Sequence, residues 1–167
     1  MPLESRPRTR QLGHVTDYRI AKNRCPTTIH LVDGTTLEGD IFLDPVSRFR
    51  PAPQQPAEFF NFTEPFFVLA AGDSSVLVAR ESVAHAVTAL PASEADDSLD
   101  AARVGVGVEV SLAGGRVCRG WIFPEITEGR ARLVDFLNSW PGRFFEMSDD
   151  HHLMLVNRSA VTHVREI

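Results

Sequence analysis

Short runs of alternating apolar and polar residues recur along the chain and predict β-strands. In residues 106–112 apolar side chains occupy every second position, and residues 28–31 alternate in the same way. Asp33-Gly34 follows one run and Gly114-Gly115 follows the other, and such pairs supply the positive φ angles of a tight hairpin turn. The pattern therefore predicts one β-hairpin in each half of the chain.

The two halves are related by an internal repeat. Residues 29–42 align without gaps on residues 110–123, with glycines at the same two places in both segments. Further blocks follow in the same order: 58–61 on 135–138, 66–67 on 144–145, 77–80 on 155–158 and 83–85 on 161–163. The shared order of these blocks indicates a duplicated unit.

Each unit is predicted to contain five short strands. Gly39 and Gly120 stand in the middle of the second strand, where a glycine indicates a sharp bend or a bulge. Residues 58–61 and 134–138 fit either a short strand or one helical turn. The later strands are expected at 66–69, 76–80 and 83–87, and in the second unit at 144–147, 153–158 and 161–164. We therefore predict an all-β fold of two tandem small barrels.

Composition divides the chain into four segments. Residues 1–26 form a basic N-terminal arm, 27–88 and 105–167 are the two units, and 89–104 is an acidic linker rich in turn-forming residues. The arm carries a net charge of +4 and the rest of the chain −9, within a total of −5. Because its apolar residues are scattered, the arm cannot build a core and is expected to be flexible.

Length and composition exclude several classes of protein. No apolar run among the 167 residues is long enough to span a membrane, and the N-terminus lacks a signal-like apolar stretch, so a cytoplasmic protein is expected. The negative charge argues against a generic nucleic-acid binder. Cys25 and Cys118 form neither a zinc motif nor a CxxC pair, which favours two reduced thiols.

Several motifs resemble a known family. The hairpin with an inner glycine, followed at the end by Asn157-Arg158-x-x-Val161, is similar to bacterial Sm-like domains. The run from Arg130 through Asp135-Phe136-Leu137-Asn138 to Phe144-Phe145 resembles small bacterial proteins with an R…DFLN…F signature, which have no assigned activity. The resemblance implies two Sm/SH3-like barrels packed as a pseudo-dimer, and it implies oligomers.

Sm-like proteins bind RNA, so RNA or nucleotide binding is the alternative function. Arg80 and Arg158 stand near the basic motif of that family, although Ser82 and Ala160 replace its glycine. The arm would add positive charge that attracts phosphates. Its candidate residues are Arg6, Arg8 and Arg10.

Few residues suggest catalysis or metal binding. Asp149-Asp150-His151-His152 gathers four potential ligands, but adjacent residues of a turn point apart, which favours a solvated hairpin tip. His85 and His163 hold the same repeat position, which favours a shared structural role over metal ligation. No nucleophile elbow, phosphate loop or dinucleotide fingerprint occurs, so neither an enzyme nor a cofactor is predicted.

The aromatic residues, among them the clusters at 59–62 and 66–67, exceed what one face of a small barrel needs. Surplus aromatic side chains either thicken a core or form an interface. The candidate partner-binding residues are the aromatics Phe42, Phe60, Trp121, Phe123 and Trp140, together with Arg80 and Arg158. We predict a non-catalytic interaction or scaffold module that binds a protein partner, or itself, through barrel edges and exposed aromatics.

Overall fold

The computed structural model describes residues 21–90, 104–124 and 132–167. The first half contains β1 (Asn23–Leu31), β2 (Thr36–Leu43), α1 (Pro56–Phe60), β3 (Phe66–Ala71), β4 (Ser74–Ala79), the 3-10 helix η1 (Arg80–Ser82) and β5 (Val83–Ala89). The second half contains β6 (Val106–Leu112), β7 (Val117–Ile122), α3 (Leu133–Ser139), β8 (Phe144–Ser148), β9 (His152–Asn157), η2 (Arg158–Ala160) and β10 (Val161–Glu166). The prediction of a mostly β fold is confirmed. β1 begins four residues before the expected start of the first unit.

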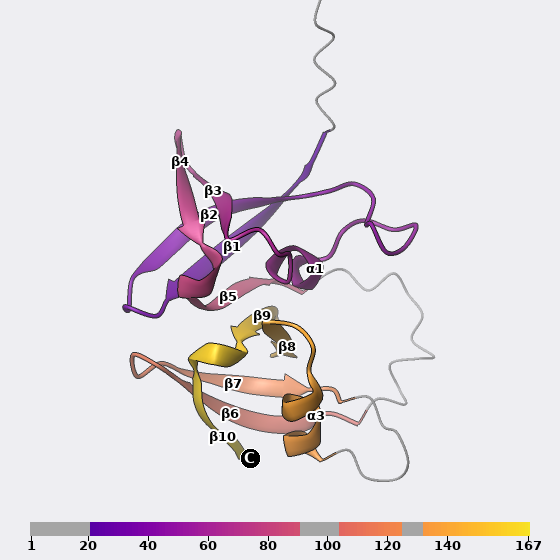
Figure 1. Ribbon diagram of the computed structural model, residues 1–167, viewed down its shortest axis with the longest axis vertical. Helices are drawn as coiled ribbons and strands as arrows, with labels where there is room; N and C mark the ends of the chain where they lie inside the picture. Colours follow the sequence, from indigo (N-terminus) through magenta and orange to yellow (C-terminus); the bar gives the residue numbers. More distant parts are fainter. Residues whose placement is uncertain (1–20, 91–103, 125–131) are drawn as a thin grey trace, which may run out of the picture.

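The strands of the described residues form one antiparallel sheet. Their order is β10-β6-β7-β8-β9-β5-β1-β2-β3-β4. The two halves meet where β5 pairs with β9, in a register that runs from His85↔Val156 to Ala89↔His152. In Figure 1 these two strands lie between the indigo-to-pink half and the orange-to-yellow half. Within the described part of the chain, β4 and β10 are therefore the two free edges of the sheet.

The structure contains the expected hairpin turns, and it shows that the third block is helical rather than a strand. Gly34, Gly114 and Gly115 have φ angles of 92°, 85° and 82°, as the turn prediction requires. The third block is helical in both halves, as α1 and α3, and Pro56 suits the start of α1 because the first helical turn needs no N–H donor there. No helix within the described ranges has the length and apolar character to cross a membrane.

Gly39 and Gly120 permit a close strand crossing and do not mark a bulge. A Cβ atom at Gly39 would lie 2.3 Å from the carbonyl oxygen of Ala70, and one at Gly120 would lie 2.5 Å from that of Ser148. The pairings of β1 with β2 and of β6 with β7 run without a register shift, so of the two expectations, a bend or a bulge, the bulge is wrong. The glycines instead let the third strand of each half pass directly over the second.

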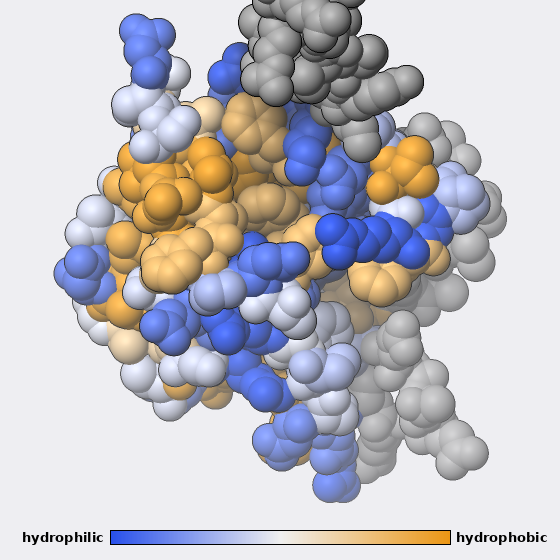
Figure 2. Space-filling view, turned by 45° about the horizontal axis from the view of Figure 1, so that its top comes forward, coloured by the Kyte–Doolittle hydropathy of each residue, from blue (hydrophilic) through white to orange (hydrophobic). Residues whose placement is uncertain are grey.

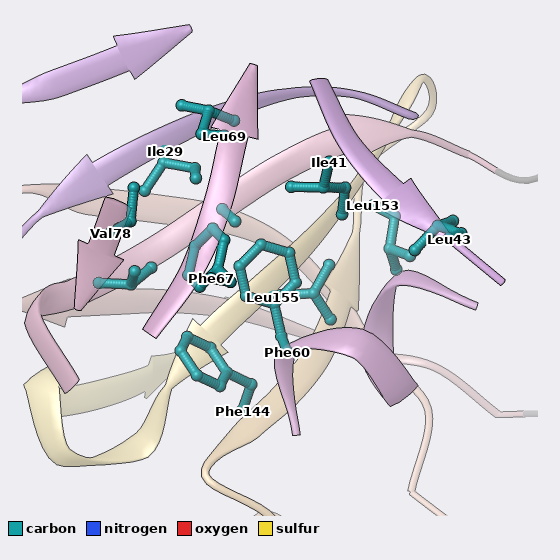
Figure 3. Close-up of a cluster of buried hydrophobic side chains, with 12 residues drawn as sticks. Ile29, Ile41, Leu43, Phe60, Phe67, Leu69, Val78, Phe144, Leu153 and Leu155 are labelled. Atoms are coloured by element: carbon teal, nitrogen blue, oxygen red, sulfur yellow. The ribbon is translucent and has the colours of Figure 1, made fainter. Parts of the chain in front are cut away.

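Each half contributes side chains to the core of the other. The first cluster contains Ile41 and Phe60 together with Phe144 and Leu155 from the second half, which point toward them in Figure 3. The second cluster likewise includes Ala84 of β5. Because both cores are completed across the joint, separating the halves would expose apolar surface on each of them.

Candidate interaction surface

The joint between the halves is anchored by hydrogen bonds to the backbone of Phe144. Asn61, which follows α1, donates from Nδ2 to the Phe144 carbonyl (2.9 Å) and accepts from the Phe144 N–H at Oδ1 (2.8 Å). The Trp140 Nε1 donates to the same carbonyl at 2.8 Å. Asn157 of β9 donates from Nδ2 to the carbonyl of Val83 at 2.8 Å. The β8–β9 hairpin is thus seated on α1 and β5 by specific polar contacts.

Asn61→Ala is expected to lower the free energy of unfolding by about 2 kcal/mol, because the buried N–H of Phe144 loses its acceptor. Asn138 is the matched control, since it holds the same repeat position but is exposed, and its side chain makes no hydrogen bond to another described residue. Asn138→Ala should change that free energy by less than about 0.5 kcal/mol. Urea unfolding followed by circular dichroism measures both, and equal losses would contradict the assignment.

Two predicted partner-binding residues are buried inside the first half. Phe60 is fully buried and packs against Phe144, with ring centroids 5.4 Å apart. Arg80 is also buried, and it donates from Nε to the carbonyl of Glu64 (2.8 Å) and from Nη1 to that of Phe59 (2.7 Å). The prediction that Phe60 and Arg80 contact a partner is therefore wrong, because the core already covers both side chains.

The other predicted residues are spread over the molecule. Trp121 and Phe123 are exposed, whereas Phe42 is half-buried. Arg158 is exposed, and its Nη1 donates to the carbonyl of the half-buried Trp140 at 2.6 Å. The candidate residues of the basic arm lie outside the described residues: Arg6, Arg8 and Arg10. The structure therefore does not bring the predicted residues together into one site.

The β3–β4 hairpin carries an exposed apolar surface, of which the sequence pointed to the Phe66-Phe67 cluster but not to Val68 or Leu77. Phe66 is 58% exposed and Leu77 is 72% exposed, and Val68 lies opposite Leu77 in the β3–β4 register. Figure 2 shows hydrophobic surface gathered over this part of the molecule. The free edge β4 has no charged residue between Ser74 and Ala79. It therefore lacks the charged side chains that commonly prevent an edge strand from pairing.

The internal repeat held a signal for this surface. Phe66 aligns with Phe144 and Leu77 with Leu155, and both second-half residues are fully buried at the joint. The alignment pairs these positions from sequence alone. It does not tell which of the two hairpins is buried, because burial depends on which strand of each unit pairs with the other unit.

A second unfilled surface lies at the other end of the sheet. An open groove of about 990 Å³ runs between α3 and the free edge β10. Its lining includes Leu133, Leu137 and Asn138 from the helix and Thr162, His163 and Val164 from the strand. Arg132 and Glu166 also line it. The groove thus combines apolar and charged side chains with a strand edge that is unpaired among the described residues.

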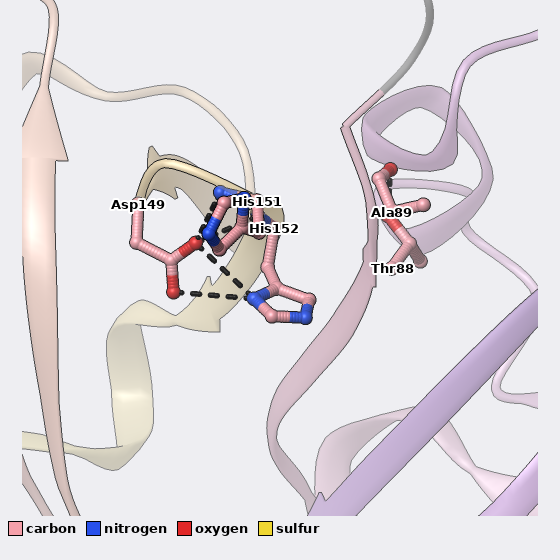
Figure 4. Close-up of polar contacts among 5 residues, drawn as sticks. All are labelled: Thr88, Ala89, Asp149, His151 and His152. Carbon is pink, nitrogen blue, oxygen red and sulfur yellow. Dashed lines mark hydrogen bonds and ion pairs between the residues drawn. The ribbon is translucent and has the colours of Figure 1, made fainter.

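The turn between β8 and β9 is closed by the carboxylate of Asp149. Its Oδ1 accepts from the backbone N–H groups of His151 (2.8 Å) and His152 (2.7 Å), and it lies 3.2 Å from Nδ1 of His152, as Figure 4 shows. The hydrogen bond from the His151 N–H is the main cause that lowers the pKa of Asp149. Among the described residues, no group of three or more His, Cys, Asp or Glu side chains is placed to hold a metal ion.

The two repeat-related histidines have different surroundings, contrary to the expectation of one shared role. His85 is 6% exposed and stacks on His30, with ring centroids 4.3 Å apart. Burial, and then the neighbouring His30 and Arg116, lower the pKa of His85 to about 3. His163 is exposed and lines the groove beside α3. His85 is therefore a neutral packing group.

Both cysteines are free thiols. Burial raises the pKa of Cys118 to about 11, and burial likewise raises the pKa of Cys25. Because the thiolate is the reactive form, both side chains are weak nucleophiles at neutral pH.

Comparisons with known proteins gave no match. The chain matches no protein-family model, no curated protein and no solved structure. The resemblance to Sm-like domains thus rests on the sequence motifs given above, and it stays a prediction.

Proposed function

We propose that this protein is a non-catalytic interaction module, in which two Sm-like barrel units present strand edges and apolar side chains to a protein partner. The observation that carries the proposal is the uncharged free edge β4, with Phe66 and Leu77 exposed beside it. Unpaired N–H and C=O groups of an edge strand accept an additional strand, and apolar neighbours of that strand cover the exposed side chains.

The joint inside the chain supports this mode of binding. There, β9 adds to β5 as a neighbouring strand, while Phe144 and Leu155 enter the first hydrophobic cluster. Main-chain pairing and apolar anchors thus act together, which is the combination expected of binding by strand addition.

The alternative of RNA binding gains no support from Arg80. The guanidinium lies over the rings of Phe59 and Phe67 and donates to backbone carbonyls, so it does not face solvent. The arginines of the arm, on which the alternative also depends, lie outside the described residues. We therefore argue for a protein partner.

A photo-crosslinking amino acid at position 77 tests the proposal in a lysate of the native host. We expect a discrete protein adduct, because Leu77 lies at the free edge and is exposed. The matched control carries the same group at Val46, which is also apolar and exposed but lies in the loop between β2 and α1.

A variant of the crosslinking chain gives the second control of this experiment. Phe66→Lys in a chain that carries the crosslinking group at position 77 should abolish the adduct, because it places a charge on the same exposed apolar surface. No adduct at position 77, or the same adduct from position 46, would contradict the proposal.

A further inference from the structure

We infer that the partner of the β3–β4 hairpin is a second copy of this chain, bound head to tail through the groove between α3 and β10. This inference rests on the proposed function and names the partner of that same surface. In the joint, the β8–β9 hairpin pairs with β5 and packs on α1. The repeat equivalents of these two surfaces are the β3–β4 hairpin and the groove between α3 and β10, and both are exposed among the described residues.

The first open surface is a hairpin of the kind that the joint buries. In the second half, Phe144 and Leu155 are fully buried against the first half. Their repeat equivalents in the first half, Phe66 and Leu77, are likewise large and apolar, yet they are mostly exposed. The β3–β4 hairpin therefore carries apolar side chains at the same two repeat positions, and no described residue of the chain covers them.

The second open surface is the groove between α3 and β10, which corresponds to the surface that binds the β8–β9 hairpin in the joint. In the joint, Phe60 packs on Phe144, Asn61 bonds to the Phe144 backbone, and Ala86 pairs with Leu155. The repeat places Leu137, Asn138 and Val164 at these three positions in the second half, and all three line the groove. The groove thus has the apolar side chain, the amide and the strand edge that the joint uses.

The register of the joint predicts the register between two chains. His85↔Val156 and Ala86↔Leu155 in the joint correspond to His163↔Val78 and Val164↔Leu77 between β10 of one copy and β4 of another. Asn138 then takes the place of Asn61 and bonds to the backbone of the partner's Phe66. Since β4 carries no charge, the pairing requires no like-charge contact from that strand.

Four substitutions make the contact between chains weaker than the joint. On the hairpin, Leu153 is replaced by Ser75 in the repeat, which removes an apolar anchor, and Asn157 by Ala79, which removes the hydrogen bond to the receptor strand. On the receptor strand, the charged residues Arg165 and Glu166 stand where the joint has Val87 and Thr88. We therefore expect reversible association that depends on concentration. Because donor and receptor surfaces differ, the contact is heterologous and can add copy after copy into a ring or a filament.

Complementary variants of the purified full chain test the inference by light scattering after gel filtration. Leu77→Lys disables the hairpin of a chain and leaves its groove, whereas Asn138→Arg blocks the groove and leaves the hairpin. Both positions are exposed, so the circular dichroism spectrum and the melting temperature of each variant should match those of the wild type.

We expect the mass of the wild type to rise with concentration from the micromolar to the near-millimolar range, and each variant alone to stay monomeric. An equimolar mixture of the variants should form dimers and nothing larger, since each mixed pair has one intact hairpin and one intact groove. Cysteines at Leu77 of one chain and Val164 of another should form a disulfide, and cysteines at Ser75 and Val164 should not.

A wild type that stays monomeric throughout this range would overturn the inference, as would folded variants whose mixture fails to dimerise. The proposed function is tested separately by the adduct from position 77. An adduct with a different protein, together with a monomeric purified chain, would leave the proposed function standing and remove only the second copy as partner.

Discussion

Replacing Arg80 by alanine is expected to lower the free energy of unfolding by about 4 kcal/mol. The guanidinium satisfies the carbonyls of Glu64 and Phe59 and lies over the rings of Phe59 and Phe67, and burial lowers its pKa. Hydrogen bonds from a charged donor contribute about 1.5–3 kcal/mol each, and alanine also leaves a cavity between the rings. Denaturant unfolding followed by circular dichroism measures the loss.

Arg158→Ala is the matched control for this prediction. Arg158 holds the same repeat position, but it is exposed, and its side chain makes one hydrogen bond among the described residues, to the carbonyl of Trp140. Its removal should cost less than about 1 kcal/mol. Arg80→Lys should lose more than this control, because an ammonium lacks the planar fork that reaches two carbonyls while stacking on a ring. Similar losses for the two alanine variants would show that burial does not govern the contribution of Arg80.

Acidification is expected to destabilise the fold by about 2 kcal/mol between pH 6.5 and pH 5. The pKa of His85 is lowered from 6.5 to about 3 in the folded chain, so the unfolded chain binds more protons in this range. Stability is therefore complete above pH 6.5 and falls by about 1.4 kcal/mol per pH unit as the pH drops toward 3. His85 Nδ1 has no hydrogen-bond partner among the described residues, so nothing there receives the added proton.

The side chains around His85 also disfavour its protonation. His30 stacks on it, and burial lowers the pKa of His30 as well. Arg116 adds positive charge that opposes protonation of both rings. Asp33, Asp149 and Glu109 have pKa values lowered from 3.8, 3.8 and 4.5, and they destabilise the fold mainly below pH 5, so measurements down to pH 5 isolate the histidines.

His85→Gln removes the main titrating group without introducing a charge. The free energy of unfolding of this variant should fall much less than that of the wild type between pH 6.5 and pH 5. His163→Gln, at the exposed equivalent position, should keep the wild-type slope. Urea unfolding at four or more pH values measures the slopes, and an unchanged slope in the His85 variant would refute the assignment.

Three of the predictions compare two residues at equivalent positions of the repeat, one held by tertiary contacts and the other exposed to solvent. Asn61 and Arg80 are held by backbone contacts, and His85 is buried, whereas their equivalents Asn138, Arg158 and His163 are exposed. The differences therefore measure what tertiary contact adds to the same residue type at the same place in the unit.

The strands, the hairpin turns and the order of elements in both halves follow from the amino-acid sequence alone. These features depend on neighbouring residues, because alternation fixes which face of a strand is apolar, and Asp33-Gly34 or Gly114-Gly115 supply positive φ angles wherever they stand. The third block stayed ambiguous, since a run of five residues is too short for its periodicity to separate a helix from a strand.

Which residues lie at the surface and which lie in the core depends instead on contacts between distant parts of the chain. Phe60 and Arg80 are predicted to bind a partner but are buried, while Leu77 is not among the predicted residues and is exposed. Local pattern cannot make this distinction, because both copies of a repeat position have similar neighbours in sequence. The deciding contact is the pairing of β5 with β9, which covers one hairpin and one helix and leaves their repeat equivalents open at the two ends of the sheet.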